Sequence, residues 1–254
     1  MFQRSSFIVI HALVWGLVLT VSAVAQDGSL WVAHSGGVAE LDTSTDLVIE
    51  PVDGLTDGRA VAVDAARGVV WYAAADRLGQ ITLSGAAAGS FPAPLGAAGA
   101  VLLAIDPVDG HPWLAAEGRL RSFSAGGIEF QDLSLGGPVL GLAFGAAGGL
   151  VWAATEDVVV GLDRVTGIEG ARLDPEDPVV ALTVDAESGA LWVALIGELR
   201  RYPTAAPQED EPFVRLPEVG LTQLLPDGQG GVWAPRPPTS PLPWTGGSGP
   251  TRSM

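Results

Sequence analysis

Six tryptophans recur at nearly even intervals along the chain, and this spacing is the feature that most constrains the fold. Neighbouring members stand 39 to 42 residues apart. An internal repeat of this length is typical of chains that stack one small supersecondary unit after another. Of the eight tryptophans in the chain, the six that keep this repeat are Trp31, Trp71, Trp113, Trp152, Trp192 and Trp233.

Other positions follow the same repeat. An alanine stands two residues after each of the first five tryptophans, and Pro235 takes that place in the sixth unit. An aliphatic residue stands seven residues after each of the first five tryptophans. A glycine stands three residues before every one of the six, namely Gly28, Gly68, Gly110, Gly149, Gly189 and Gly230.

One repeat unit translates into four short strands. Residues 60–63 are an apolar run, as expected of a strand buried on both faces. Residues 64–68 begin with aspartate and end with glycine, which favours a turn. Residues 69–73 are β-branched or aromatic, residues 78–83 alternate between apolar and polar, and a ragged outer strand ends near Phe91.

Four strands in about forty residues make up one blade of a β-propeller. A single blade cannot bury both of its faces, whereas blades stacked around an axis cover each other. We expect the tryptophans to be core side chains between blades, not a carbohydrate-stacking array, with the small alanine making room for the next blade. The prediction is an all-β propeller over residues 26–235, with five or six four-stranded blades and incomplete blades at the ends.

Both ends of the chain differ from the repeat. Residues 1–25 combine a single early arginine, an apolar run over 7–21 and small residues at 23–25, the layout of a cleavable signal peptide. A retained membrane anchor is the alternative, but the apolar run is short for a span and no basic cluster follows it. We predict a secreted or periplasmic protein whose first blade lacks its inner strand. Residues 236–254, rich in Pro, Gly, Ser and Thr, are predicted to be a disordered tail.

The charge balance limits the partners that we expect. The formal net charge is −16, with 13 basic and 29 acidic residues. Such a surface repels nucleic acid and anionic lipid, so we expect neither nucleic-acid binding nor membrane binding after cleavage. A protein or small-molecule ligand fits better, especially a cationic one. The chain also has no cysteine, lysine or asparagine, which excludes disulfides and N-glycosylation.

The segment VAVDAARGVVWYAAADRLGQITL at 61–83 resembles the repeats of exported YVTN/NHL-type and streptogramin-lyase-like propellers. The resemblance covers about residues 28–235 and implies an architecture, because these repeats serve many functions. Streptogramin-lyase-like enzymes need a histidine acid/base and a metal, and gluconolactonase-like propellers hold calcium with carboxylate and asparagine ligands. This chain has no asparagine, and neither catalytic set can be matched to it residue by residue.

Few residues remain as candidates for binding. His34 follows the second strand of the first unit, and that connection opens on the propeller face where ligands usually bind. The segment 53–59 joins two blades and carries both charges. The predicted binding residues are therefore His34, Asp53, Asp57 and Arg59. The second histidine of the mature chain, His111, is expected to be an ordinary turn residue.

We expect no cofactor and no catalytic residues. Residues 106–110 and 174–177 could offer oxygen ligands to calcium, but neither matches a spaced calcium loop. The acidic run at 208–211 is most simply a solvated edge.

The favoured hypothesis is a non-catalytic extracytoplasmic binding or protein-interaction module. The alternatives are a metal-dependent hydrolase or lyase of the lactonase or streptogramin-lyase type, and a truncated fragment of a larger repeat protein. Three or more converging carboxylates or histidines at the channel mouth would favour the enzyme.

Overall fold

The structure is a computed structural model, and the regular secondary structure of its described residues is entirely β-strand. No helix in the described part of the chain is long and apolar enough to cross a membrane. The residues that the structure describes are 11–14, 17–24, 29–42, 47–51, 55–96, 100–145, 149–185, 188–203, 211–215, 224–226 and 231–233.

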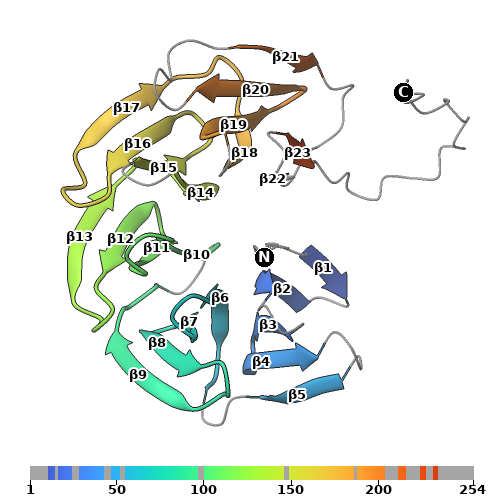
Figure 1. Ribbon diagram of the computed structural model, residues 1–254, viewed down its shortest axis with the longest axis vertical. Helices are drawn as coiled ribbons and strands as arrows, with labels where there is room; N and C mark the ends of the chain where they lie inside the picture. Colours follow the sequence, from blue (N-terminus) through green and yellow to red (C-terminus); the bar gives the residue numbers. More distant parts are fainter. Residues whose placement is uncertain are drawn as a thin grey trace, which may run out of the picture.

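The described strands form six antiparallel sheets that follow one another around a common axis (Figure 1). We number these sheets as blades 1 to 6 in chain order. Blades 2 to 5 each have four strands joined as a meander, blade 1 has five and blade 6 has two. The innermost strands of successive blades lie next to each other, so the chain is a β-propeller, as the repeat predicted.

Blade 1 contains β1 (His11–Val14), β2 (Leu17–Val24), β3 (Ser29–His34), β4 (Gly37–Asp42) and β5 (Leu47–Pro51). Blade 2 contains β6 (Gly58–Asp64), β7 (Val69–Ala74), β8 (Arg77–Thr82) and β9 (Ala87–Pro92). Blade 3 contains β10 (Leu102–Ile105), β11 (Pro112–Ala116), β12 (Arg119–Phe123) and β13 (Glu129–Ser134).

Blade 4 contains β14 (Gly141–Phe144), β15 (Leu150–Ala154), β16 (Val159–Asp163) and β17 (Glu169–Leu173). Blade 5 contains β18 (Val179–Val184), β19 (Ala190–Leu195), β20 (Glu198–Pro203) and β21 (Glu211–Arg215). Blade 6 contains β22 (Leu225–Pro226) and β23 (Val232–Trp233).

The hydrophobic core lies between neighbouring blades, and each blade-to-blade cluster contains one tryptophan of the repeat. Trp31 lies between blades 1 and 2, Trp71 between 2 and 3, Trp113 between 3 and 4, Trp152 between 4 and 5, and Trp192 between 5 and 6. The first four side chains are no more than 1% exposed, and Trp192 is partly buried. Each indole therefore fills the gap between its own sheet and the next one.

The alanine two residues after each tryptophan makes this packing possible. Each of these alanines belongs to the same core cluster as its tryptophan, and none is more than 2% exposed. Because residues two apart on a strand share a face, a larger side chain here would push the next blade away from the indole. The five residues are Ala33, Ala73, Ala115, Ala154 and Ala194.

The sixth tryptophan does not follow the pattern. Trp233 is 69% exposed, so the prediction that it is a core side chain is wrong. It belongs to blade 6, and the next blade around the ring would be blade 1. The described core clusters join each blade to its successor from blade 1 to blade 6, and none of them joins blade 6 back to blade 1. The indole therefore has no described sheet to cover it.

The first blade also differs from expectation, because it has an inner strand. β2 pairs antiparallel with β3, with Thr20 opposite Ala33 and Val21 opposite Val32. Both β1 and β2 lie within residues 1–25, the predicted signal peptide, so cleavage would remove them. Cleavage itself stays a prediction. The predicted tail at 236–254 and the repeat glycines Gly28 and Gly230 lie outside the described residues.

A repeated turn explains the aspartate and the glycine that precede the tryptophans. Asp64, Asp106 and Asp185 are buried at the end of an inner strand. Their carboxylates accept backbone N–H groups of the following turn at 2.8 to 3.1 Å. The glycine that closes the turn has a positive φ, which side-chain-bearing residues rarely adopt: 68° at Gly68, 78° at Gly110 and 69° at Gly189.

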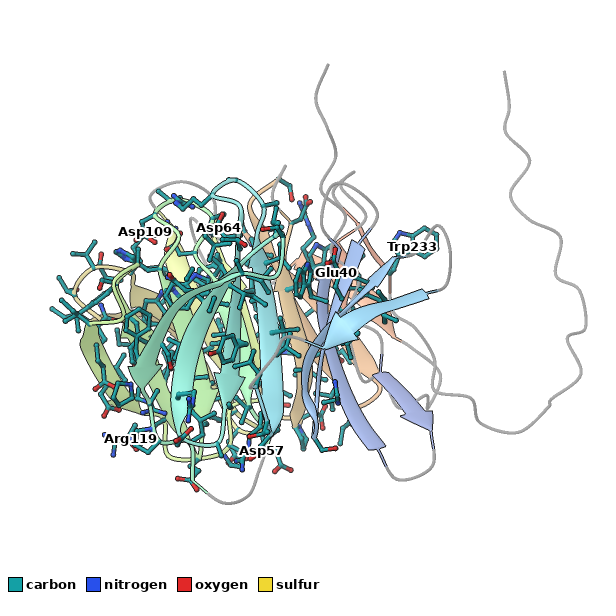
Figure 2. The ribbon with its side chains drawn as sticks, turned by 90° about the horizontal axis from the view of Figure 1, so that it is seen from below. Glu40, Asp57, Asp64, Asp109, Arg119 and Trp233 are labelled. Carbon is teal, nitrogen blue, oxygen red and sulfur yellow. The ribbon has the colours of Figure 1, made fainter. Side chains whose placement is uncertain are left out.

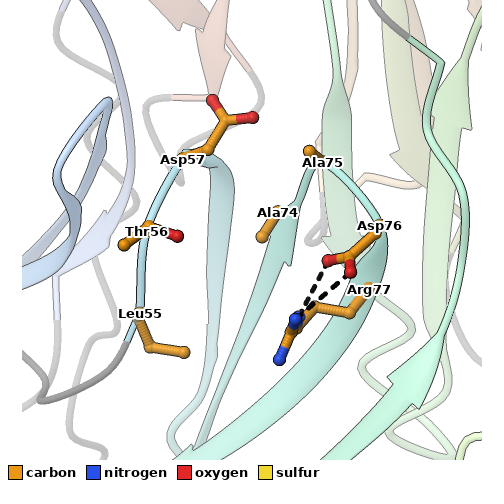
Figure 3. A pocket seen from close by; sticks show the side chains of 7 residues that line it. All are labelled: Leu55, Thr56, Asp57, Ala74, Ala75, Asp76 and Arg77. Atoms are coloured by element: carbon orange, nitrogen blue, oxygen red, sulfur yellow. Dashed lines mark hydrogen bonds and ion pairs between the residues drawn. The ribbon is translucent and has the colours of Figure 1, made fainter.

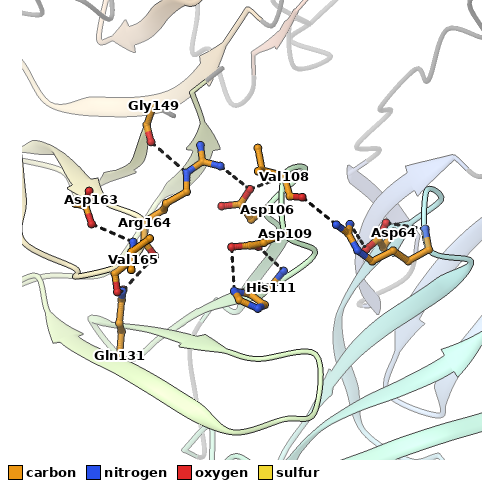
Figure 4. Close-up of polar contacts among 11 residues, drawn as sticks. Asp64, Asp106, Val108, Asp109, His111, Gln131, Gly149, Asp163, Arg164 and Val165 are labelled. Carbon is orange, nitrogen blue, oxygen red and sulfur yellow. Dashed lines mark hydrogen bonds and ion pairs between the residues drawn. The ribbon is translucent and has the colours of Figure 1, made fainter. Parts of the chain in front are cut away.

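These turns also tie neighbouring blades together (Figure 4). Arg164 of blade 4 donates from Nη1 to Asp106 Oδ1 of blade 3 at 2.9 Å, and both side chains are buried. Arg67 of blade 2 donates from Nη2 to the carbonyl of Val108 in blade 3 at 3.0 Å. Burial raises the pKa of Asp106 above its ordinary value, although the nearby guanidinium opposes the shift. Polar contacts therefore add to the indole packing between blades.

The burial pattern predicts different costs for two tryptophan substitutions. We expect Trp71→Ala to lower the free energy of unfolding by about 3–5 kcal/mol, because it leaves a cavity between blades 2 and 3. Trp233→Ala should change it by no more than about 0.5 kcal/mol, because the indole is already in water. Urea unfolding followed by circular dichroism measures both. Equal losses in the two variants would contradict the inter-blade packing.

Candidate functional site

The alternating turns of the antiparallel blades divide the ring into two faces. Face I carries the turns between the second and third strands of each four-stranded blade, together with the connections between blades. Face II carries the turns between the first and second strands and between the third and fourth. In Figure 2, Asp57 and Arg119 lie on face I, whereas Asp64 and Asp109 lie on the opposite face II.

The β3–β4 turn of blade 1 packs tightly against the chain that enters blade 2. A Cβ atom on Gly37 would come within 2.2 Å of the carbonyl oxygen of Leu55, and one on Gly58 within 2.0 Å of the carbonyl oxygen of Gly37. Only glycine allows the two backbones to approach this closely. The Nδ1 atom of His34 accepts the N–H of Gly36 at 3.0 Å, which holds the imidazole against its own turn.

Three of the four predicted binding residues come together in this region. The N–H of Asp57 donates to the carbonyl of Ser35 in the turn that follows His34, at 3.1 Å. The Asp57 carboxylate pairs with Arg59 at 3.1 Å, and Arg59 also donates to the carbonyl of Gly96 at 2.8 Å. Asp53, the fourth predicted residue, lies outside the described residues.

A hollow of about 360 Å³ opens beside this loop on face I (Figure 3). The β7–β8 turn forms its other wall and contributes Asp76 and Arg77. These two side chains form an ion pair, with Arg77 Nε 2.8 Å from Asp76 Oδ1. The hydrogen bond from Arg77 lowers the pKa of Asp76 below its ordinary value of 3.8. The lining residues are Leu55, Thr56, Asp57, Ala74, Ala75, Asp76 and Arg77.

A second hollow of about 460 Å³ lies on the same face beside blade 3, but on the other side of the turn between the second and third strands. It lies between the β11–β12 turn, which contains Glu117, and the chain that leaves blade 3 at Ser134. Glu117 adopts φ of 52°, and Gly96 packs against its carboxylate. Two successive blades therefore place an acidic turn residue beside a hollow on the same face.

The acidic turn residues were not among the predicted binding residues. A usable signal was present in the repeat itself, because acidic residues stand four or five positions after three successive tryptophans. They are Asp76, Glu117 and the pair Glu156 and Asp157. The repeat pattern of the unit identifies the positions that pack in the core. The acidic residues between the strands have the composition of ordinary loops, so they were not selected.

The described residues contain no group of three or more His, Asp or Glu side chains placed to hold one metal ion. His111 forms a pair with Asp109 at 3.0 Å on face II, and its ring packs edge-on against Phe130 at 5.1 Å. Asp174, in the acidic segment 174–177, pairs with Arg172 at 2.9 Å. Residues 208–210 of the acidic run lie outside the described part.

Comparison with known proteins defines the class of the fold. No family model matches the chain, and no curated protein matches it. In contrast, 1073 chains of solved structures do. One belongs to the "Crystal Structure of Mitotic Checkpoint Complex", with a TM-score of 0.71 and 12% identity over 88% of this chain and 73% of that chain. At this identity the likeness shows the β-propeller fold alone.

The ion pair beside the first hollow predicts how Asp76 titrates. The midpoint of the Asp76 carboxyl should lie below 3.8 in the wild type, because Arg77 stabilises the charged form. Arg77→Gln should raise that midpoint toward the ordinary value. A ¹³C NMR titration of the carboxyl carbons measures both, with Asp132, which pairs with Arg119, as the carboxyl that should not move. An unchanged Asp76 midpoint would contradict the ion pair.

Proposed function

We propose that the protein is a non-catalytic binding module that acts outside the cytoplasm and takes a protein or small-molecule ligand on face I. The observation that carries the proposal is the pair of hollows on face I beside blades 2 and 3, each of which has as one wall a turn with an acidic side chain. Turns on a rigid ring of sheets are well suited to binding, because they can vary without disturbing the core. Of the predicted residues, Asp57 lines the first hollow, Arg59 pairs with Asp57, and His34 precedes the turn that accepts the N–H of Asp57.

The charge of this face indicates the kind of ligand. Asp57, Asp76 and Glu117 line the two hollows, and the neighbouring turn of blade 4 adds Glu156 and Asp157. Arg59 and Arg77 balance Asp57 and Asp76 beside the first hollow, so the excess of negative charge comes from Glu117, Glu156 and Asp157. The balance on the described part of the face is negative, so a ligand with an ammonium or guanidinium group would gain the most.

A metal-dependent hydrolase or lyase is the alternative, and no specific observation in the described residues favours it. Lactone hydrolysis by the full chain that requires added calcium and stops with a chelator would support this alternative.

A fragment without an independent fold is the other alternative. It would melt without cooperativity, whereas six sheets joined by shared cores should unfold as one unit.

A thermal-shift screen of the full chain tests the binding proposal. The probes are a library of amines and guanidines together with divalent metal ions. We expect at least one cationic probe to raise the melting temperature, because a ligand that binds only the folded state stabilises it. Asp76→Asn combined with Arg77→Gln should abolish that shift, since both side chains line the first hollow.

The matched control is Arg119→Gln combined with Asp132→Asn, which removes another exposed ion pair outside the lining of either hollow. This variant should keep the shift. If no probe stabilises the wild type, or if both double variants lose the shift equally, the first hollow is not the binding site.

Export rests on the signal-peptide layout of residues 1–25, and it can be tested separately. We expect the protein recovered from a secreting host to begin near residue 26, as intact-mass measurement would show. Recovery of the full-length chain, with β1 and β2 retained, would contradict export by cleavage. It would also mean that the apolar segment serves as the inner part of blade 1.

A further inference from the structure

Exposed apolar side chains are concentrated in and beside the face II turns of blades 3 and 4. Eight large apolar side chains are strongly exposed among the described residues, and five of them lie in or beside the face II turns of these two blades. We call these five the isoleucine surface: Val108, Ile128, Phe130, Val165 and Ile168. Exposed apolar side chains that gather in one place, in contrast to isolated ones, mark interaction sites.

The centre of this surface is a tripeptide that occurs twice. Gly127-Ile128-Glu129 leads into β13, and Gly167-Ile168-Glu169 leads into β17, forty residues later. The two turns are closed by corresponding hydrogen bonds, although the turn of blade 4 is one residue longer. The isoleucine carbonyl accepts an N–H from Ser124 or Asp163, and the glycine N–H donates back to the same residue. The two isoleucines are 71% and 68% exposed.

The turn does not require isoleucine. Blade 2 makes the hydrogen bonds of the blade 3 turn with Ala86 in place of Ile128, since the carbonyl of Ala86 accepts the N–H of Thr82 and Gly85 donates back to Thr82. An exposed isoleucine gives the folded monomer almost no hydrophobic stabilisation. Its presence at the matching place in blades 3 and 4 is therefore not explained by the fold, and it favours a role in contact with another molecule.

The two turns are held rigidly relative to each other. Gln131 of blade 3 donates from Nε2 to the carbonyls of Arg164 and Val165 in blade 4, at 3.2 and 2.8 Å (Figure 4). The buried pair of Arg164 and Asp106 joins the same two blades. A partner would therefore meet a preformed pair of apolar anchors, and little ordering would oppose its binding.

The charges around the surface indicate what the partner carries. Each isoleucine is followed by a glutamate whose side chain is more than 40% exposed, and the nearest arginine nitrogens lie 3.8 Å from Glu129 and 3.6 Å from Glu169. Such loose, exposed pairs leave both carboxylates available to a partner. A second copy of this chain, with a net charge of −16, or an anionic membrane would be repelled.

We propose that the isoleucine surface is a second interaction site, and that it binds a polypeptide segment in which large apolar side chains are flanked by lysine or arginine. The apolar side chains would pack on Ile128 and Ile168, and the basic ones would pair with Glu129 and Glu169. The surface lies on the face opposite to the candidate ligand site and does not depend on it.

Selection from a phage-displayed library of random dodecapeptides on the immobilised full chain tests this proposal. We expect the enriched peptides to carry a net positive charge and at least two large apolar residues. Ile128→Ala combined with Ile168→Ala should weaken their binding by at least about tenfold, as for apolar anchors at an interface. Ala86 shows that the turn of blade 3 forms with alanine, and both isoleucines are exposed, so the variant should keep the wild-type melting temperature.

Two further variants separate the contributions. Ile196→Ala removes an isoleucine that is 62% exposed on face I and should leave peptide binding unchanged. Glu129→Gln combined with Glu169→Gln should make binding less sensitive to salt. The proposal would be overturned if the enriched peptides carried no positive charge, or if Ile196→Ala weakened peptide binding as much as the paired alanines do. It would also be overturned if the wild-type chain formed a dimer that the paired alanines abolish. Binding to phosphatidylglycerol vesicles through the two isoleucines would overturn it as well.

Discussion

The indole of each repeat tryptophan is held between its own sheet and the next one, and most of the structure depends on that contact. A four-stranded sheet has two faces to bury, and the ring satisfies this need by pressing each sheet against its neighbours. The largest side chain of each unit fills the gap, and the alanine two residues later leaves space for it. Buried aspartates in the turns and the Arg164–Asp106 pair then fix the turns of adjacent blades to each other.

This constraint also explains which parts of the fold were readable from the sequence. The strands and the inter-blade tryptophans recur about every forty residues, and the turn aspartate recurs in three of the units, so a local pattern was enough to predict them. The closing end of the ring has no such repeat. Trp233 looks like its five predecessors in sequence, but its burial depends on a neighbouring sheet that the pattern cannot supply. The apolar run before residue 25 has the composition of both a signal peptide and a buried strand, and pattern alone does not separate them.

The candidate sites were less predictable, because they depend on which turns the ring brings together. His34 was selected from a connection within the first unit, and Asp57 and Arg59 from the connection between two blades. The structure joins these two segments through the hydrogen bond from Asp57 to Ser35. The second wall of the hollow, with Asp76 and Arg77, comes from a turn whose own sequence looks ordinary. The isoleucine surface could not be predicted, because the sequence does not show that Ile128 and Ile168 are exposed while many other aliphatic residues are buried. The two faces thus offer different chemistry on one scaffold: charged hollows on face I and apolar anchors on face II.

The most direct test of the packing is the hydrogen exchange of the indole N–H groups in a chain labelled with ¹⁵N-tryptophan. If the indoles lie between the sheets, the N–H groups of Trp31, Trp71, Trp113 and Trp152 should exchange only on global unfolding, whereas that of Trp233 should exchange at once. Similar, rapid exchange for all of these indoles would show that they face solvent. The ring of stacked blades would then be wrong.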